Sequence, residues 1–489
     1  MPHFEPFRET RTFEVVDVQN YPLEEVTPLS DIDCTYIRTY LPITSTYKLT
    51  NDVDKELVIS NLCKGLQQTM QEYRFMAGNV QVNSKGRFFV KRSAAQRTFT
   101  VHINHLEHTD FPSYAELEQR EFPFSELDDQ HLPPNYCPIG DATTKPDEGH
   151  PVTLIQLNTI RGGIIIGTAI HHQCVGAKGI DAVIARWAAH ARALFTGTPA
   201  PAFDASCLDQ TPLNSTTPLP PNRIPEVEDK IKSLKYIPVL PDMQPAPPCA
   251  TAQAAFHFPA SKLAALKAAT QRAQQQQQQQ PGAWVSTNDC LTALLWRAMQ
   301  RVKTARSPDA ANDDPGRSVN MLQAVDIRDH HDPPIPHAYP GNTVFVSFVA
   351  APRGRVGADG ALPELARAVR AAVARWRARD MIEDVKDYIA AFPDKEGVRL
   401  ALGAGPELDT VVTSWGVMTA YRSHDFGFGP LRALRVALGS FKGMFVILPR
   451  RIREEEWDEG IEVFVSLDKD DMERMKGDEE VLKWGEVRW

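Results

Sequence analysis

The sequence lacks any apolar run approaching the roughly 18 residues that a membrane-spanning helix needs. Its first residues also lack the basic-then-apolar pattern of a secretory signal. The seven cysteines are scattered, odd in number and without paired short spacings, which is typical of reduced thiols rather than of a disulfide framework or a zinc cage. We therefore expect a cytoplasmic protein that does not act at a membrane.

An excess of basic charge is missing as well. The net charge is −9, with acids and bases interspersed, whereas a nucleic-acid-binding protein needs a basic face that displaces counterions from phosphates. This argues against nucleic acid as a partner. Hydrophobic residues make up 42% of the 489 positions, which is enough for a real core in a chain long enough for two domains.

Strand-like and helix-like patterns alternate along the chain, and the texture changes once. The stretches "TPLPPNRIP" and "VLPDMQPAPPCA" are rich in proline, which breaks helices and central strands. We therefore predict an N-terminal domain over residues 1–205, a Pro-rich crossover linker over 206–250 and a C-terminal domain over 251–489. The mixture of strands and helices predicts an α/β (α+β) fold in each domain.

Two adjacent histidines stand where a buried strand must end. The apolar run "GGIIIGTAI" is followed by His171 and His172, and a helical pattern, "IDAVIARWAAHARALF", comes soon after. A sheet holds the backbone rigidly at such a position, and a histidine can take up a proton near neutral pH. The alternative for either ring is a satisfied structural histidine.

The stretch "TSWGVMTAYRSHDFGFGP" is a second candidate for chemistry. On a strand, Thr413 and Trp415 would face the same side, which fits either a pair of donors to an oxyanion or a buried polar pair. In "DFGFG", Gly427 and Gly429 alternate with aromatic residues after Asp425. Such a stretch permits a tight backbone path that another segment can approach closely.

The third candidate is "AVDIRDHHDPPIPHAYPGN". Asp326 and Arg328 are predicted to share one strand face, and a Pro-rich loop follows. His330, His331 and His337 in that loop suggest a metal site. We expect no metal, because the histidines lack the helix-borne spacing of a metalloprotease.

The order and spacing of these stretches resemble the BAHD acyltransferase family, in particular its trichothecene acetyltransferase-like members of fungal secondary metabolism. "QEYRFMAGNV" resembles the family's yPxLAGrl segment, "AIHHQCVGAKG" lies where its HxxxDG motif belongs, and "TSW…DFGFGP" resembles its TSW…DFGWGxP. The resemblance covers nearly the whole chain. It implies two similar chloramphenicol-acetyltransferase-like domains, with mixed sheets and flanking helices, joined by a long crossover loop around a channel.

The resemblance also implies an activity, namely O- or N-acyl transfer from acyl-CoA to a small-molecule alcohol or amine. It implies a monomer with no permanently bound cofactor and with acyl-CoA as co-substrate. By position, His172 would be the catalytic base, and Thr413 and Trp415 would lie near the oxyanion and the acceptor. Supporting positions are His171, Gly176, Arg328, Asp425, Gly427 and Gly429. The motifs do not identify the CoA-binding residues, although a few Lys or Arg must line one channel mouth.

The chain departs from the family pattern at one informative position. The motif aspartate is Gly176 here, and in the family that aspartate pairs with an arginine that corresponds to Arg328. Because an unpaired buried charge costs several kcal/mol, Arg328 should have another partner. Asp425 is the first candidate and Asp181 the second.

The missing aspartate leaves two alternatives open. The chain could catalyse another reaction, such as cyclisation or condensation of a polyketide or peptide intermediate, or it could be a non-catalytic ligand-binding relative. Condensation domains of peptide synthetases share the doubled histidine and take acyl groups from a carrier protein. The sequence does not identify the donor, the acyl group, the acceptor or the pathway.

Overall fold

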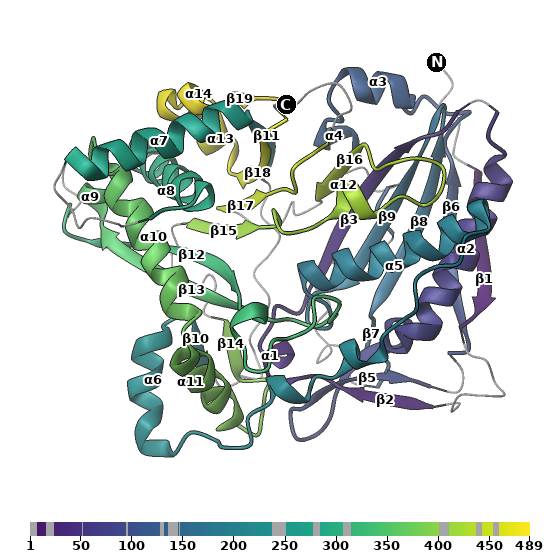
Figure 1. Cartoon of the computed structure of the whole chain (residues 1–489), viewed down its shortest axis with the longest axis horizontal. Coiled ribbons are helices and arrows are strands. Elements are labelled where there is room, and N and C mark those ends of the chain that lie inside the picture. Colours follow the sequence, from purple (N-terminus) through teal and green to yellow (C-terminus); the bar gives the residue numbers. More distant parts are fainter. Residues whose placement is uncertain are drawn as a thin grey trace.

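Two large mixed sheets, each flanked by helices, lie side by side in the computed structural model (Figure 1). We call them the first sheet and the second sheet in the order in which the chain enters them. The structure describes residues 7–15, 24–50, 52–93, 96–127, 132–134, 145, 147–236, 251–276, 284–306, 314–400, 410–436, 443–452 and 459–489.

The first sheet has the strand order β1-β6-β8-β9-β3-β16. Its β9 is buried along its whole length, which explains why this strand reads as a continuous apolar run rather than an alternating one. Within this sheet, β6 and β8 run parallel to each other, and the other neighbouring strands are antiparallel. Helices α2 and α5 pack against each other. The elements are β1 (Phe7–Glu14), β3 (Tyr40–Lys48), α2 (Lys55–Glu72), β6 (Thr98–His105), β8 (Thr153–Ile160), β9 (Gly163–His171), α5 (Ala177–Thr196) and β16 (Ala433–Val436).

The second sheet has the order β13-β12-β15-β17-β18-β11-β19. Its central pairs β12–β15 and β15–β17 are parallel, and the buried helix α8 packs against α7 and α10. The strands are β11 (Ala252–Phe258), β12 (Ser318–Asp326), β13 (Val344–Pro352), β15 (Thr410–Ser414), β17 (Met444–Ile447), β18 (Ile461–Leu467) and β19 (Glu486–Val487). The helices are α7 (Ala260–Gln276), α8 (Thr287–Arg306), α9 (Arg353–Gly357), α10 (Leu362–Trp376), α13 (Lys469–Lys476) and α14 (Glu479–Trp484).

Shorter elements complete the fold. A four-stranded sheet contains β2 (Glu25–Pro28), β4 (Asn79–Val82), β5 (Phe88–Arg92) and β7 (His150–Pro151), and a two-stranded sheet contains β10 (Leu234–Tyr236) and β14 (Val398–Leu400). The short α-helices are α1 (Asp31–Cys34), α3 (Tyr114–Gln119), α4 (Phe124–Leu127), α6 (Ile224–Ile231), α11 (Arg379–Ala390) and α12 (Ala420–Ser423). The 3-10 turns are η1 (Arg74–Ala77), η3 (Ala205–Leu208), η4 (Thr211–Leu213), η5 (Pro221–Arg223) and η6 (Arg328–His330).

The α/β class predicted from the sequence is confirmed, and so are the strand and the helix on either side of the two histidines. The Pro-rich stretch 206–250 contains 3-10 turns, α6 and β10 up to Tyr236, and its remainder lies outside the described residues. The domain limits given above remain predictions. In the described part of the chain, no helix combines the length and apolarity that a membrane crossing requires.

A strand from the second half of the chain completes the first sheet. β16 pairs antiparallel with β3, so that Ala433 lies opposite Thr46. On β16, the buried Arg435 forms an ion pair with the buried Glu462 of β18, with Nη1 at 3.0 Å from Oε2. Arg488 approaches the same carboxylate at 2.9 Å. This buried cluster therefore ties the first sheet to the second.

Burial alone would raise the pKa of Glu462, but the charges of Arg435, Arg488 and Arg451 outweigh it and lower the pKa to about 2. The folded pKa lies below the ordinary 4.5, so the stabilisation is fully present above pH 4.5. It is lost as the pH falls from there toward 2.

We therefore expect Glu462→Gln to lower the free energy of unfolding at pH 6 by about 3 kcal/mol. The variant should also lose the part of the acid sensitivity that comes from this carboxylate. Urea unfolding at pH 6 and pH 3.5 measures both effects. Glu226→Gln, which removes an exposed ion pair, is the control and should change little. An unchanged urea midpoint for Glu462→Gln would show that the cluster does not stabilise the fold.

Candidate functional site

The two histidines at the end of β9 have different surroundings. His171 is buried, and its ring meets that of Tyr40 edge-on at 5.3 Å between centroids. His172 is only partly buried, its backbone N–H donates to the Thr39 carbonyl at 2.8 Å, and its ring lies 5.1 Å from that of Tyr36. His171 therefore belongs to the core, whereas His172 lines a cavity.

The ring of His172 is poised in its neutral form. Burial lowers its pKa to about 4, while backbone groups of His172 and Val175 act in the opposite direction. The shift therefore comes from poor solvation of the charged form rather than from a nearby charge. Nδ1 is buried, so Nε2 is the ring nitrogen that a molecule in the cavity can reach.

The cavity beside His172 has a volume of about 500 Å³, and both halves of the chain line it. The same cavity is lined by Thr413, which lies near the end of β15, and by Trp415, which follows that strand directly. The structure thus brings the three predicted catalytic positions to one cavity. The start of α8 and the strand β12 supply further walls.

Three cationic side chains line this cavity, and one of them lies against an exposed indole outside its lining. Lys178, Arg370 and Arg377 line it, and Nε of Arg377 is a buried donor without a hydrogen-bond partner among the described residues. Trp284 is 57% exposed. The Arg370 guanidinium lies 4.6 Å from the Trp284 ring centroid, and the Lys267 ammonium lies 5.5 Å from it. Sequence reasoning did not identify these residues, because isolated basic and aromatic residues carry no motif.

Gly176 is the N-cap residue of α5, and its lack of a side chain has a steric reason. A Cβ built there would lie 3.0 Å from Oδ1 of Asn342. One turn later, a Cβ on Gly179 would lie 1.8 Å from the Pro340 carbonyl oxygen. The two glycines thus allow the loop 339–342 to lie directly against the start of α5.

The expected partners of Arg328 are wrong. Its guanidinium pairs with Asp326, with Nη1 at 3.0 Å from Oδ2, and Nη2 donates to the Tyr339 carbonyl at 3.1 Å. Asp425 and Asp181 bind elsewhere. The physical reason is that β12 ends at Asp326 and the chain turns into η6. The two residues therefore do not share a strand face, and the turn brings their side chains together.

Asp425 and Asp181 each organise a segment near the cavity. Asp425 Oδ1 accepts the backbone N–H of Gly427 at 2.9 Å, which closes its own turn. Asp181 on α5 accepts the backbone N–H of Thr419 at 2.9 Å and pairs with His424 at 3.1 Å. Asp181 therefore holds the segment that follows Trp415 against α5.

The segment with alternating glycines has the tight path that its sequence predicts. Gly427 and Gly429 have φ angles of 101° and 130°, a region that strongly favours glycine. A Cβ on Gly427 would lie 3.0 Å from Cα of Arg192 in α5. Phe426 is fully buried and meets Trp187 edge-on at 5.0 Å. These contacts indicate a packing role.

The histidines after β12 do not come together. His330 and His337 are exposed. His331 is buried, with Nδ1 at 2.8 Å from the Pro333 carbonyl and Nε2 at 3.2 Å from Lys386 Nζ. Within the described ranges, no group of three or more His, Cys, Asp or Glu side chains could hold a metal ion.

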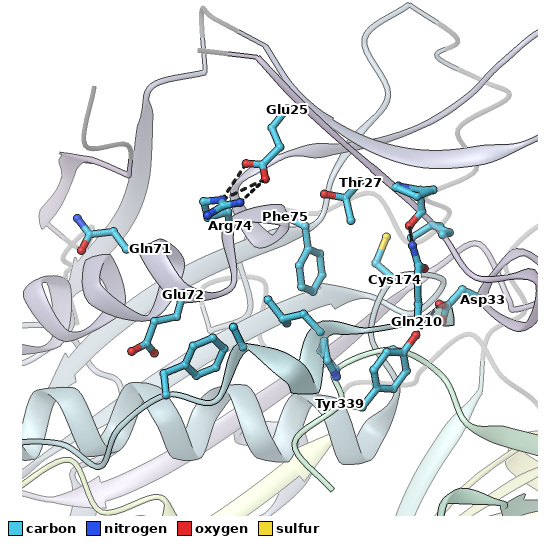
Figure 2. A pocket seen from close by; sticks show the side chains of 17 residues that line it. Glu25, Thr27, Asp33, Gln71, Glu72, Arg74, Phe75, Cys174, Gln210 and Tyr339 are labelled. Atoms are coloured by element: carbon cyan, nitrogen blue, oxygen red, sulfur yellow. Dashed lines mark hydrogen bonds and ion pairs between the residues drawn. The ribbon is translucent and has the colours of Figure 1, made fainter. Parts of the chain in front are cut away.

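A second cavity of about 410 Å³ lies behind the loop that carries His172. Cys174 and Tyr339 stand at one side of it, and the ion pair of Glu25 with Arg74 stands at another (Figure 2). The chain segments that follow His172 and Tyr339 therefore separate the two cavities.

Substitution of Gly176 tests the steric account. We expect Gly176→Ala to lower the free energy of unfolding by about 1 kcal/mol, because its Cβ crowds Asn342. Gly176→Asp adds the same Cβ but can cap α5, so it should be about 1 kcal/mol more stable than the alanine variant. Thermal unfolding measures both. In Gly357→Ala, the control, the new Cβ has open space. Wild-type stability of Gly176→Ala would contradict the account.

Comparisons with known proteins identify the family of this chain. A model of the transferase family matches residues 9–482. Acetyltransferase FGR3 of Gibberella zeae is 27% identical over 96% of this chain and 92% of its own. Trichothecene 3-O-acetyltransferase TRI101 of Fusarium sporotrichioides is 26% identical over 91% of this chain and 93% of its own.

The fold also matches a solved structure, F. graminearum TRI101 complexed with coenzyme A and deoxynivalenol. The TM-score is 0.76 and the sequence identity is 21%, and the match covers 95% of this chain and 100% of the other. This confirms the predicted fold. With the match of the family model over nearly the whole sequence, it follows that the chain belongs to the transferase family, the BAHD acyltransferases, and is an enzyme that transfers acyl groups.

Proposed function

We propose that this enzyme transfers an acyl group from acyl-CoA to a hydroxyl or amine of a small molecule in the 500 Å³ cavity, with His172 as the base. The observation that carries the proposal is the convergence of His172, Thr413 and Trp415 on that cavity from two different sheets. Relatives that act as O-acetyltransferases support an oxygen acceptor over an amine.

The neutral imidazole suits the first step. Nε2 of His172 takes the proton of the acceptor hydroxyl as the oxygen attacks the thioester carbonyl carbon. The tetrahedral oxyanion then collapses, the C–S bond breaks, and the leaving thiolate receives the proton from His172. A base with a pKa of about 4 is weak in the free enzyme. The imidazolium is stabilised as negative charge develops beside it in the transition state.

Thr413 and Trp415 supply donors for the developing charge. The threonine hydroxyl and the indole N–H are the donor types that an oxyanion requires, and donors fixed before the reaction cost no reorganisation. The neighbouring backbone is fixed too, because the N–H of Trp415 donates to the Ile447 carbonyl at 2.8 Å.

Cations in the cavity wall suit the phosphates of CoA, and the exposed indole of Trp284 suits its adenine. The chain carries a net charge of −9, so a polyanionic donor needs local positive charge. Arg377 lies in the cavity wall together with Lys178 and Arg370. Lys178 pairs with Asp181 at 3.0 Å and Arg370 with Asp289 at 2.7 Å, so Arg377 is the cation of the three that we expect to contribute most. The exposed indole of Trp284, beside Arg370, offers a flat surface on which a base can stack.

Apolar walls favour an apolar acceptor. The aliphatic side chains that line the cavity include Ile37, Leu41, Leu322, Val325, Val344, Val346 and Val373. A polycyclic alcohol with few polar groups fits such walls better than a sugar or a charged metabolite. One relative bears the name eremophilane O-acetyltransferase, which supports the same class.

Binding of the donor is the first test. Isothermal titration with acetyl-CoA should detect binding, and Trp284→Ala should weaken it at least fivefold, since a stacked base contributes about 1 kcal/mol or more. S-acetylpantetheine, which lacks the adenosine, is the control and should bind wild type and variant equally. If neither acetyl-CoA nor longer acyl-CoAs bind, a carrier-dependent condensation or a cyclisation would fit better.

Removal of the base is the second test. His172→Gln should lower turnover by about 10²–10⁴ with the fold intact, and Thr413→Ala by about 10²–10³. In wild type, the neutral form is the active one. kcat/KM should therefore hold down to pH 5 and fall as the pH passes through about 4. His330→Gln, at an exposed position, is the control. Near-full activity of His172→Gln would reject the proposed base.

A further inference from the structure

Asn342 reaches from the loop 339–342 to the backbone beside the proposed base. Its side-chain Nδ2 donates to the His172 carbonyl at 2.9 Å and approaches the Gln173 carbonyl at 3.4 Å. The same Nδ2 donates to Oδ1 of Asp33 at 2.9 Å. Asn342 is buried, so these bonds are shielded from competition with water.

Asp33 in α1 holds Asn342 from the other side. Oδ1 of this carboxylate also accepts the Asn342 backbone N–H at 2.7 Å. Oδ2 accepts the Ser30 hydroxyl at 2.6 Å and faces the Tyr339 hydroxyl at 3.4 Å. Asp33 is buried, and burial raises the pKa of its carboxyl to about 6, although the hydrogen bonds from Ser30 and Asn342 act in the opposite direction. Protonation on Oδ2 leaves Oδ1 able to accept both Asn342 donors, so the contact with Asn342 does not depend on the charge of Asp33.

We call Asp33 and Asn342, with the hydrogen bonds that join them to each other and to the His172 carbonyl, the clamp. The glycine at the motif position leaves the space that the Asn342 side chain occupies. Asn342 Oδ1 lies 3.0 Å from the place of the absent Cβ of Gly176, so the amide occupies the space beside that residue. Arg328, which the motif aspartate would engage, pairs with Asp326 instead. No carboxylate of the motif itself therefore fixes the turn after His172.

We propose that Asp33, acting through Asn342, is a positioning residue that keeps the turn carrying His172 in place and its ring desolvated. The proposal rests on the proposed function, in which His172 is the base. Neither residue touches the reacting atoms. Their effect is transmitted through the backbone carbonyl of His172, which they hold, to the orientation and burial of its ring.

The pKa of His172 distinguishes a positioning role of Asp33 and Asn342 from a role in the stability of the fold alone. That pKa is low because the protein packed around the ring leaves the imidazolium poorly solvated. If the clamp is removed and the turn loosens, water reaches the imidazole and the pKa moves back toward its ordinary 6.5. A substitution that only destabilises the folded state leaves the pKa of the folded molecules unchanged.

The test follows the His172 ring signal by NMR in full-length protein labelled with ¹³C in its histidine rings, from pH 8 to pH 5. His172→Gln identifies the signal. In wild type it should stay in the neutral position throughout. In Asn342→Ala and Asp33→Leu the pKa should rise by more than one pH unit, so that the signal titrates within this range.

Two variants act as matched controls. Asp33→Asn keeps the oxygen that accepts both Asn342 donors, and its amide can donate to Ser30, so it should retain the wild-type titration. Asp31→Leu removes a second buried carboxylate of α1, which pairs with Arg87 at 2.6 Å, and should destabilise the fold without moving the pKa of His172.

A raised His172 pKa in Asn342→Ala and Asp33→Leu, but not in the two controls, would support the positioning role. A wild-type titration in Asn342→Ala, an equal pKa rise in Asp31→Leu, or failure of both Asn342→Ala and Asp33→Leu to fold would overturn the positioning role. The measurement needs no acyl donor. Lack of acyl-CoA binding would therefore count against the proposed function alone, whereas a normal His172 titration would count against the clamp alone.

Discussion

The site depends on the close contact between the loop 339–342 and the turn that follows β9. The backbone N–H of Gly176 donates to the Pro340 carbonyl at 3.1 Å, and Gly179 lets that carbonyl approach where no side chain would fit. This contact fixes the start of α5, and the start of α5 fixes where the chain leaves His172. A bulkier residue at Gly179 would separate the two segments, and the cavity wall they form would open.

Buried polar groups secure the other contacts between the halves of the chain. Arg435 of β16 reaches Glu462 in the second sheet, and Asp181 of α5 binds the segment after Trp415 through Thr419. Apolar surfaces would allow such segments to slide past one another, because hydrophobic contact is non-directional. A satisfied buried charge tolerates only the arrangement in which its donors are present. The polar anchors therefore specify which parts of the second half face His172.

The sequence is informative where structure is determined locally. The apolar run before His171 predicts β9 because every position there is buried, and the periodicity after Gly176 predicts α5. The pairing of β16 with β3 could not be predicted, since β16 is four residues long and its partner lies far away in the chain. Candidate site residues follow the same division, because His172, Thr413 and Trp415 stand in recognisable motifs.

Contacts that cross the fold are invisible in the sequence. Asp33 and Asn342 are 309 positions apart, and nothing in "LSDIDC" marks its second aspartate as a partner of the loop. The partner of Arg328 was missed for the opposite reason. Asp326 is only two residues away, but the family pattern directs attention to a carboxylate from another element.

With glycine at the motif position, other residues make the contacts that the motif aspartate would make, and the His172 ring is unchanged. An aspartate at 176 would stand at the N-terminus of α5, against Asn342. In this chain Asp326 neutralises the arginine, and the Asn342 amide holds the turn. His172 still lines the cavity that Thr413 and Trp415 share. Loss of the motif carboxylate is thus compatible with the proposed acyl transfer, because Asn342 holds the backbone of His172 in its place.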